Sequence, residues 1–336
     1  MRYIRYFINI VFIIVAFFVI SKEFRDTYYN IPLLFKEANK SLLFFLFLFQ
    51  GLNYIGDGWL SQTLLAIAGF KIRLKDTLKI AILGVIGNHV APFVGGTIVT
   101  YHSYKKLEIP SAVISFLVSA WTIFIWLTYV LFFLLSLLFL PNLFFNFVSP
   151  KIIFAVLVGL ISISSIIFIL SRKGGKYIVW FLSIFSKLIN KIAKFSHIKN
   201  LFTPRLFKKF ISDLYQYFVF LLKSKNKIPQ VLFSSLLFYV GDILTFYFSF
   251  LVLGFQPNFA LLIFGYSISL VLTVFTLMPG APGIMEASLI VIFIKLGFPA
   301  HVVLFASLLF RLFSYWLPLP IGVFSYWRLK KVTEAK

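Results

Sequence analysis

The chain has 336 residues, of which 61% are apolar and only 12% are charged. Soluble globular domains are about half apolar and about a quarter charged, so this sequence is too apolar for one water-soluble core. Lys and Arg number 32 against 10 acids, giving a formal charge of +22. In a membrane protein this excess sets topology and attracts anionic lipid headgroups, so we expect no nucleic-acid partner. The absence of cysteine excludes disulfides, thiolate metal sites and thiol catalysis.

Apolar stretches long enough to cross a membrane recur along the whole chain. A spanning helix needs roughly 20 apolar residues. Uninterrupted candidates are residues 4–20, 41–69, 110–140, 151–171, 229–253 and 299–326. The first lacks an A-x-A-like cleavage site, which predicts an uncleaved helix. We therefore predict an all-α, polytopic transmembrane helix bundle, with residues 1–336 forming a single integral membrane domain.

Two further apolar stretches, 78–104 and 258–296, are interrupted by Pro and Gly. Pro removes a backbone donor, and Gly tolerates unwound backbone. Irregular backbone survives at membrane depth only where it is buried in protein or lines a wet cavity. Each stretch is therefore predicted to form a broken or re-entrant helical hairpin. The helix-breaking residues are Pro92, Gly95, Gly96, Pro279, Gly280, Pro282 and Gly283.

Residues 172–227 differ from their surroundings, because they contain 13 Lys and Arg and one acid, Asp213. Apolar residues recur there three or four apart, a pattern typical of amphipathic helices on an anionic membrane surface. This segment is predicted to be basic, amphipathic and cytoplasmic. It is either a plain positive-inside loop or a docking site for lipid or protein.

The sequence carries a duplication. Tyr54-Ile55-Gly56-Asp57 recurs as Tyr239-Val240-Gly241-Asp242, at an offset of 185. Further matches follow in the same order at offsets between 185 and 190: Gly-Phe after each motif, Ala-Pro in each broken stretch, and Lys-Leu-x-x-Pro. Ordered self-similarity of this kind indicates two repeats. Repeat 1 covers about 41–140 and repeat 2 about 229–326.

The distribution of charge predicts that the repeats are inverted. The basic connections belong in the cytoplasm by the positive-inside rule. With both broken stretches returning to their own side, the N- and C-termini are cytoplasmic and the Asp57 and Asp242 helices run in opposite directions. Lys295 is the charge that fits this topology poorly. Inverted repeats with broken helices are typical of transporters, whose substrate sites lie near the midplane.

Four charged residues fall inside predicted spans or beside a break: Asp57, Asp242, Glu286 and Arg311. Each costs roughly 2.5 to 3.5 kcal/mol at a helix centre unless it faces a partner, water or a ligand. They either pair with one another, as Glu286 could with Arg311, or contact a substrate. Half-helix N-termini at the breaks attract anions, so the site suits a zwitterionic or charged lipid head.

The first broken stretch also contains Asn88 and His89, which we include among the candidate substrate-binding residues. His89 could instead be a packing residue. No metal-binding spacing and no nucleotide-binding loop is present, so we expect no metal, no cofactor and no catalytic residues. The many Trp, Tyr and Phe are interpreted as lipid-facing residues and interface anchors without a chemical role.

These features resemble the lysylphosphatidylglycerol synthase transmembrane-region family, the flippase-like membrane domain of multiple peptide resistance factors. The matching pieces are Asp57, the Asn88–Gly96 segment and the Pro279–Glu286 segment. The resemblance implies a membrane domain linked to moving aminoacylated or other lipids between leaflets, with Asp57, Asp242 and Glu286 as polar-site acids. Thr97 departs from the family pattern, which has Glu there, and this departure puts a lysyl-lipid substrate in doubt.

We therefore expect a lipid or lipid-linked-precursor translocase, not an enzyme, in the cell (inner) membrane. Its partners would be membrane lipids, either anionic or zwitterionic phospholipid or a polyprenyl-linked lipid. One alternative is a non-catalytic scaffold or regulator of a lipid or glycan biosynthetic enzyme. A minor alternative is an intramembrane aspartyl protease using Asp57 and Asp242, although its flanking motifs are absent.

Overall fold

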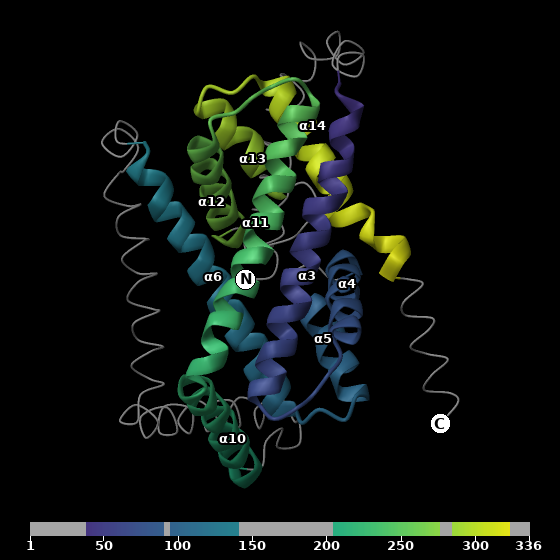
Figure 1. Cartoon of the computed structure of the whole chain (residues 1–336), viewed down its shortest axis with the longest axis vertical. Coiled ribbons are helices and arrows are strands. Elements are labelled where there is room, and N and C mark those ends of the chain that lie inside the picture. The colour runs from purple at the N-terminus through teal and green to yellow at the C-terminus, as the bar shows by residue number, and fades with distance from the viewer. Residues whose placement is uncertain (1–37, 91–94, 141–203, 276–283, 323–336) are drawn as a thin grey trace, which may run out of the picture.

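The computed structural model describes residues 38–90, 95–140, 204–275 and 284–322. The predicted spans 4–20 and 151–171 and the first part of the basic segment lie outside these residues. Within the described ranges all regular structure is helical, as predicted (Figure 1).

The helices follow the predicted apolar stretches to within a few residues. They are α3 (Leu43–Ile67), α4 (Leu74–Val90), α5 (Gly95–Lys106), α6 (Ser111–Leu138), α10 (Pro204–Lys223), α11 (Ile228–Val252), α12 (Phe259–Phe275), α13 (Ile284–Lys295) and α14 (Ala300–Arg311). Short 3-10 turns precede α3 (η2, Lys40–Leu42) and α11 (η3, Lys225–Lys227), and α14 continues into a π-helical turn, η4 (Leu312–Trp316).

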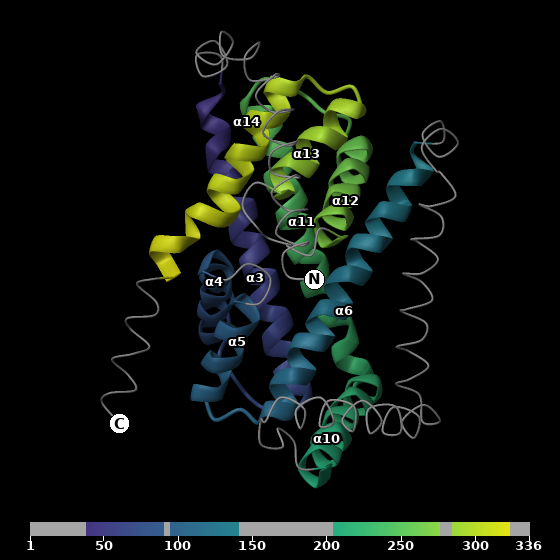
Figure 2. The ribbon, with the colours of Figure 1, turned by 180° about the vertical axis from the view of Figure 1, so that it is seen from behind.

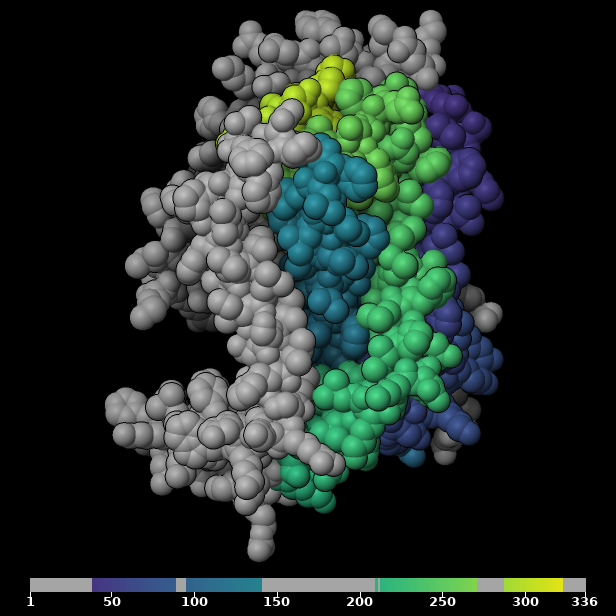
Figure 3. All heavy atoms as spheres, turned by 60° about the vertical axis from the view of Figure 1, so that its left-hand side comes forward, coloured from purple at the N-terminus to yellow at the C-terminus, as the bar shows by residue number. Residues whose placement is uncertain are grey.

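Three of the described helical segments are long and apolar enough to cross a membrane: Ser111–Leu138, Lys225–Val252 and Ala300–Gly322. α3 also has 25 residues, about 38 Å at 1.5 Å per residue, but polar residues such as Gln50 and Asp57 interrupt its apolar sequence. α6 lies at the surface (Figure 3), where it exposes the side chains of Leu127, Leu131, Leu134, Leu135 and Leu138. An exposed apolar stripe of this length fits contact with lipid.

α3 and α11 form the centre of the molecule and run antiparallel (Figure 1). At one end the Asn39 N–H, just before α3, donates to the Val252 carbonyl at the end of α11 (2.9 Å). At their crossing, a Cβ on Gly56 would overlap the backbone of Phe238, and a Cβ on Gly241 would overlap the backbone of Asn53. Small residues drive helix association in lipid because they allow backbones to approach closely.

The two broken stretches form helix pairs at opposite ends of this central pair. α4 and α5 pack on each other beside α3, whereas α12 and α13 pack on each other and against α6 and α14 (Figures 1 and 2). The breaks fall where they were predicted, between Val90 and Gly95 and between Phe275 and Ile284. α5 and α13 have 12 residues each, about 18 Å, which is too short to cross a hydrocarbon core of about 30 Å.

Each helix pair belongs to its own hydrophobic core. The first core joins the second half of α3 to α6, with α10 inserting Phe218 and Leu221. The second core joins α11 to α12, α13 and α14 and is rich in Phe, with Phe246 at its centre. Phe246 contacts the rings of Phe250, Tyr266, Phe293 and Phe310 at centroid distances of 5.1 to 5.5 Å.

Basic residues gather at one end of the described structure. The end that holds α10 and the termini of α3, α4, α5 and α11 (Figure 1) carries Lys71, Arg73, Lys75, Lys79, Lys105, Lys106, Lys209, Lys223, Lys225 and Lys227. The opposite end of the described helices carries Lys40 and Lys295. The last part of the basic segment forms α10, which buries Phe218 and Leu221 and exposes Lys209 and Lys223.

The close approach of α3 and α11 predicts that Gly56 tolerates no side chain. Gly56→Ala should lower the midpoint of thermal unfolding in detergent, because overpacking at a backbone contact costs about 1–3 kcal/mol. Gly51→Ala on the same helix is the matched control, since nothing lies within 4 Å of its Cβ position. There the higher helix propensity of Ala should leave the midpoint unchanged or raise it. Equal effects of the two substitutions would contradict this account of the crossing.

Candidate functional site

A cavity of about 410 Å³ lies beside the α3–α11 crossing and is walled by α3, α4, α5, α6, α11, α12 and α14. Its polar lining comes from Gln50, Asn53, Tyr54, Asp57, Ser61, Asn88, Thr97, Thr100, Tyr104, Trp121, Thr122, Asp242, Tyr266, Arg311 and Ser314. Two carboxylates and one guanidinium therefore meet in one space that is large enough for a polar headgroup.

Asp57 is held by α6. The indole Nε1–H of Trp121 donates to Asp57 Oδ1 at 2.7 Å. The carboxylate is only half-buried and lines the cavity. Because one of its oxygens is fixed by the indole, Asp57 is oriented while it remains open to a ligand.

Asp242 has a more enclosed environment than Asp57 and is buried. Its Oδ2 accepts a hydrogen bond from the Tyr129 hydroxyl of α6 at 3.0 Å and another from the Tyr266 hydroxyl of α12. These two donors join three helices around one carboxylate. Hydrogen bonds to charged groups contribute roughly 1.5–3 kcal/mol each, which offsets part of the cost of the buried charge.

Arg311 provides positive charge in the same cavity. It is buried at the end of α14, close enough to Asp242 to interact with it electrostatically. Its guanidinium carbon lies 5.3 Å from the centre of the Tyr315 ring, a cation–π distance. The π-helical turn begins at the next residue, Leu312, and such turns are frequent at functional sites.

The π-helical turn also connects α14 to α3. Pro318 has no N–H, so it cannot donate to the carbonyl of Ser314 four residues earlier. That carbonyl instead accepts a hydrogen bond from the Tyr54 hydroxyl at 3.2 Å. Tyr54 lies near both Asp57 and Asp242. The Tyr54 hydroxyl therefore connects α3, at a position near both acids, to the irregular part of α14.

The α4–α5 pair closes another side of the cavity. The Asn88 side chain accepts a hydrogen bond from the Gly96 N–H at 2.9 Å, across the break in the helix. A Cβ on Gly87 would overlap the Gly95 carbonyl, so this pair is packed backbone to backbone. The glycines of the first break therefore serve close packing. Asn88, Gly96 and Thr97 line the cavity as well.

The structure thus brings five of the predicted site residues into contact with one cavity: Asn88, Asp57, Gly96, Asp242 and Arg311. Gly95 is buried in the α4–α5 contact. The remaining predicted positions, or their side chains, lie outside the described residues: His89, Pro92, Pro279, Gly280, Pro282, Gly283 and Glu286. The proposed pairing of Glu286 with Arg311 falls among these.

The interpretation of aromatic residues as chemically inert was wrong for Trp121, Tyr129 and Tyr266. Trp121 donates a hydrogen bond to Asp57, and Tyr129 and Tyr266 donate to Asp242. Their partners are 64, 113 and 24 residues away, so only tertiary structure reveals the pairing. The sequence did contain a local signal for the cavity itself. On α3, Gln50, Asp57 and neighbouring polar residues recur at helical spacing and mark one polar face.

Comparison with known proteins agrees with this architecture. Residues 6–322, nearly the whole chain, match the family described as lysylphosphatidylglycerol synthase TM region. The chain belongs to this family. The resemblance carried by Asp57 and the two broken stretches is thereby confirmed, and this member of the family is a multi-pass membrane protein.

One similar protein is UPF0104 membrane protein PH1989 of Pyrococcus horikoshii, which is 27% identical over 149 residues. The match covers 44% of this chain and 44% of the relative. The chain therefore spans less than half the length of that relative.

The environment of Asp57 predicts the effect of removing its donor. Trp121→Phe should lower the free energy of unfolding by about 1–3 kcal/mol, because the carboxylate loses a hydrogen bond in a partly desolvated site. Trp126→Phe, on the same helix, is the matched control, since its ring contacts Tyr129 at 6.2 Å and lies away from Asp57. SDS titration of the purified protein measures both. Equal losses would show that only ring volume matters.

Proposed function

We propose that this protein moves the polar head of a lipid or lipid-linked precursor across the membrane through the central cavity. Membership of the family and the meeting of Asp57, Asp242 and Arg311 in one cavity are the observations that support the proposal most directly. Carboxylates can meet a cationic group and the guanidinium can meet phosphate. The substrate would be a zwitterionic or anionic phospholipid or a polyprenyl-linked lipid.

The proposal includes an inverted duplication. The reciprocal glycine contacts support it, because Gly56 meets Phe238 and Gly241 meets Asn53, and each pair is related by the same offset of 185. A self-complementary contact of this kind is expected across a two-fold axis. The antiparallel course of α3 and α11 agrees with an axis in the membrane plane.

In this arrangement the two repeats differ in what fills equivalent positions. Repeat 1 places at the cavity Ser61, Tyr104 and Trp121. At offsets of 185 and 189, repeat 2 has Phe246, Phe293 and Phe310. Those phenylalanines pack together, with Phe246 at 5.5 Å and 5.2 Å from the other two rings. At these three positions repeat 1 therefore places polar side chains and repeat 2 places part of its aromatic core, although repeat 2 also contributes Asp242, Tyr266 and Arg311 to the cavity.

The hydrogen bonds of the carboxylates favour transport over an intramembrane aspartyl protease. Such a protease needs two carboxylates that share a proton. Here Asp57 accepts from an indole and Asp242 from two phenols. A scaffolding role is the other alternative, and its supporting observation is the amphipathic α10, which exposes Phe220 and Leu222.

Reconstituted vesicles would test transport. The wild-type chain should accelerate the leaflet exchange of fluorescently labelled phospholipids, measured by dithionite quenching. Asp57→Asn and Arg311→Gln should each slow that exchange at least about tenfold, since a charge-assisted contact contributes roughly 1.5–3 kcal/mol. Asp76→Asn is the control, because Asp76 pairs with Arg73 and Lys79 at the basic end of the chain.

An Asp57→Asn variant as fast as the wild type would contradict the proposed site. A folded wild type that is no faster than protein-free vesicles would contradict transport altogether. If that inactive chain also co-purified with a lipid or glycan biosynthetic enzyme, a scaffolding role would replace the proposed transport function.

Membrane orientation can be tested because the natural chain lacks cysteine. We propose that the basic end, and with it both termini, faces the cytoplasm. The Gln256→Cys variant carries a cysteine between α11 and α12. This cysteine should then react with an impermeant maleimide in intact cells. Lys225→Cys should react only after permeabilisation. The reverse pattern would overturn the proposed orientation.

A further inference from the structure

A second cavity, of about 330 Å³, lies at the basic end of the α3–α11 pair. It is lined by Trp59, Gln62, Thr63, Ala66, Lys71, Ile72, Lys227 and Gln230. None of these residues lines the central cavity. The two lysines come from different parts of the chain, one following α3 and the other preceding α11, and they meet at this cavity.

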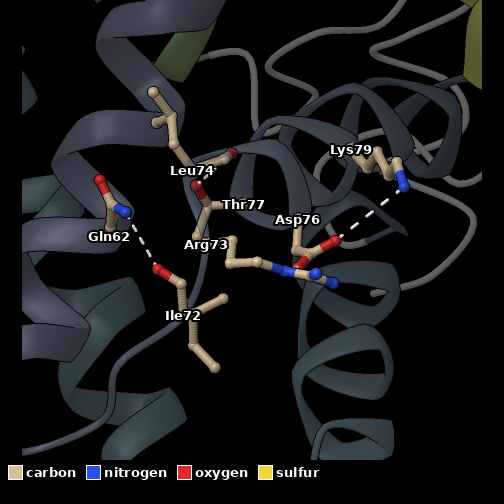
Figure 4. Close-up of polar contacts among 7 residues, drawn as sticks. All are labelled: Gln62, Ile72, Arg73, Leu74, Asp76, Thr77 and Lys79. Atoms are coloured by element: carbon tan, nitrogen blue, oxygen red, sulfur yellow. Dashed lines mark hydrogen bonds and ion pairs between the residues drawn. The ribbon is translucent and has the colours of Figure 1, made fainter.

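The walls of this cavity are held in place by neighbouring contacts. The Gln62 side chain donates to the Ile72 carbonyl at 3.0 Å, which fixes the segment after α3 (Figure 4). Asp76 is already engaged by Arg73 at 2.9 Å and by Lys79 at 3.9 Å (Figure 4). Within the described residues, no carboxylate forms an ion pair with Lys71 or Lys227. The cavity is therefore a concave, positively charged site.

One wall of the cavity continues into the lipid-facing surface. Trp59 packs edge-to-face against Phe233 at a centroid distance of 5.7 Å. Phe233 is 53% exposed and its neighbour Leu232 is 46% exposed. A ligand in this cavity would have cationic groups at its head and exposed aromatic and aliphatic surface beside its tail. That combination fits an anionic amphiphile rather than a soluble anion.

We propose that this cavity binds the phosphate headgroup of an anionic phospholipid from the leaflet at the basic end. Lys71 and Lys227 supply the charge, and the amide of Gln230 lies at the same cavity as a hydrogen-bond donor. The first turn of α11, which has no side-chain cap, adds positive potential. The acyl chains run along Trp59 and Phe233. Bound in this way, the lipid bridges the end of α3 to the start of α11 and stabilises the pair on which the central site is built.

Lipid binding to the purified full chain tests this proposal. Phosphatidylglycerol and phosphatidylcholine would be titrated separately and the bound lipid counted by native mass spectrometry. The wild type should prefer phosphatidylglycerol. The double variant Lys71→Gln/Lys227→Gln should weaken the tightest phosphatidylglycerol site about tenfold or more, given the contribution of each lysine near anionic lipid. Lys71→Arg/Lys227→Arg should keep binding because it keeps both charges, and an unchanged midpoint of thermal unfolding would show that the Gln double variant folds.

The matched control is Lys75→Gln/Lys225→Gln, which removes the same charge from two exposed lysines outside the cavity. Its effect should be much smaller. Equal weakening by both double variants, or none by the first, would overturn the site. Displacement of the lipid by excess inorganic phosphate as readily as by phosphatidylglycerol would also overturn it, because the tail would then contribute nothing. Brominated phosphatidylglycerol should quench part of the tryptophan fluorescence of the chain, and Trp59→Phe should reduce that quenching.

Discussion

The backbone contact between α3 and α11 at Gly56 and Gly241 is the constraint on which the described structure depends. Lipid offers no hydrophobic driving force between helices, so close packing and interhelical hydrogen bonds must hold them together. Both glycines immediately precede an acid that lines the central cavity, and the same close approach that joins the helices therefore brings Asp57 and Asp242 to one region. At the same crossing, the Asn53 side chain of α3 donates an interhelical hydrogen bond to the Phe238 carbonyl of α11 at 2.9 Å.

Placing charge at this depth requires partners from other helices. α6 serves both acids, through Trp121 for Asp57 and Tyr129 for Asp242. α14 adds Arg311 next to its π-helical turn. The acids differ in enclosure, because Asp242 is surrounded by phenols and Asp57 retains access to the cavity. Under the proposed function, Asp242 would stabilise the bundle and Asp57 would meet the substrate.

Much of this architecture follows from simple sequence rules. Hydropathy and length place α6, α11 and α14, while Pro and Gly place both helix breaks. The scarce intramembrane charges at Asp57, Asp242 and Arg311 predict the central cavity, because isolated charges are costly in hydrocarbon. The aromatic donors were missed, since 20% of the residues are aromatic and nothing local distinguishes Trp121 from Trp126. The basic-end cavity was missed for a similar reason: Lys71 and Lys227 are far apart in the chain.

The sequence alone determined that the chain is an all-helical membrane protein, which stretches are broken and which residues are too costly to leave without partners in lipid. Those properties depend on composition and on spacing within one helix. Tertiary structure decided which tyrosines and tryptophans satisfy the acids, why Gly56 and Gly241 bear no side chain, and where two lysines meet beside Trp59. Such pairings depend on how helices cross, and helix crossing is set by contacts between residues that local periodicity does not relate.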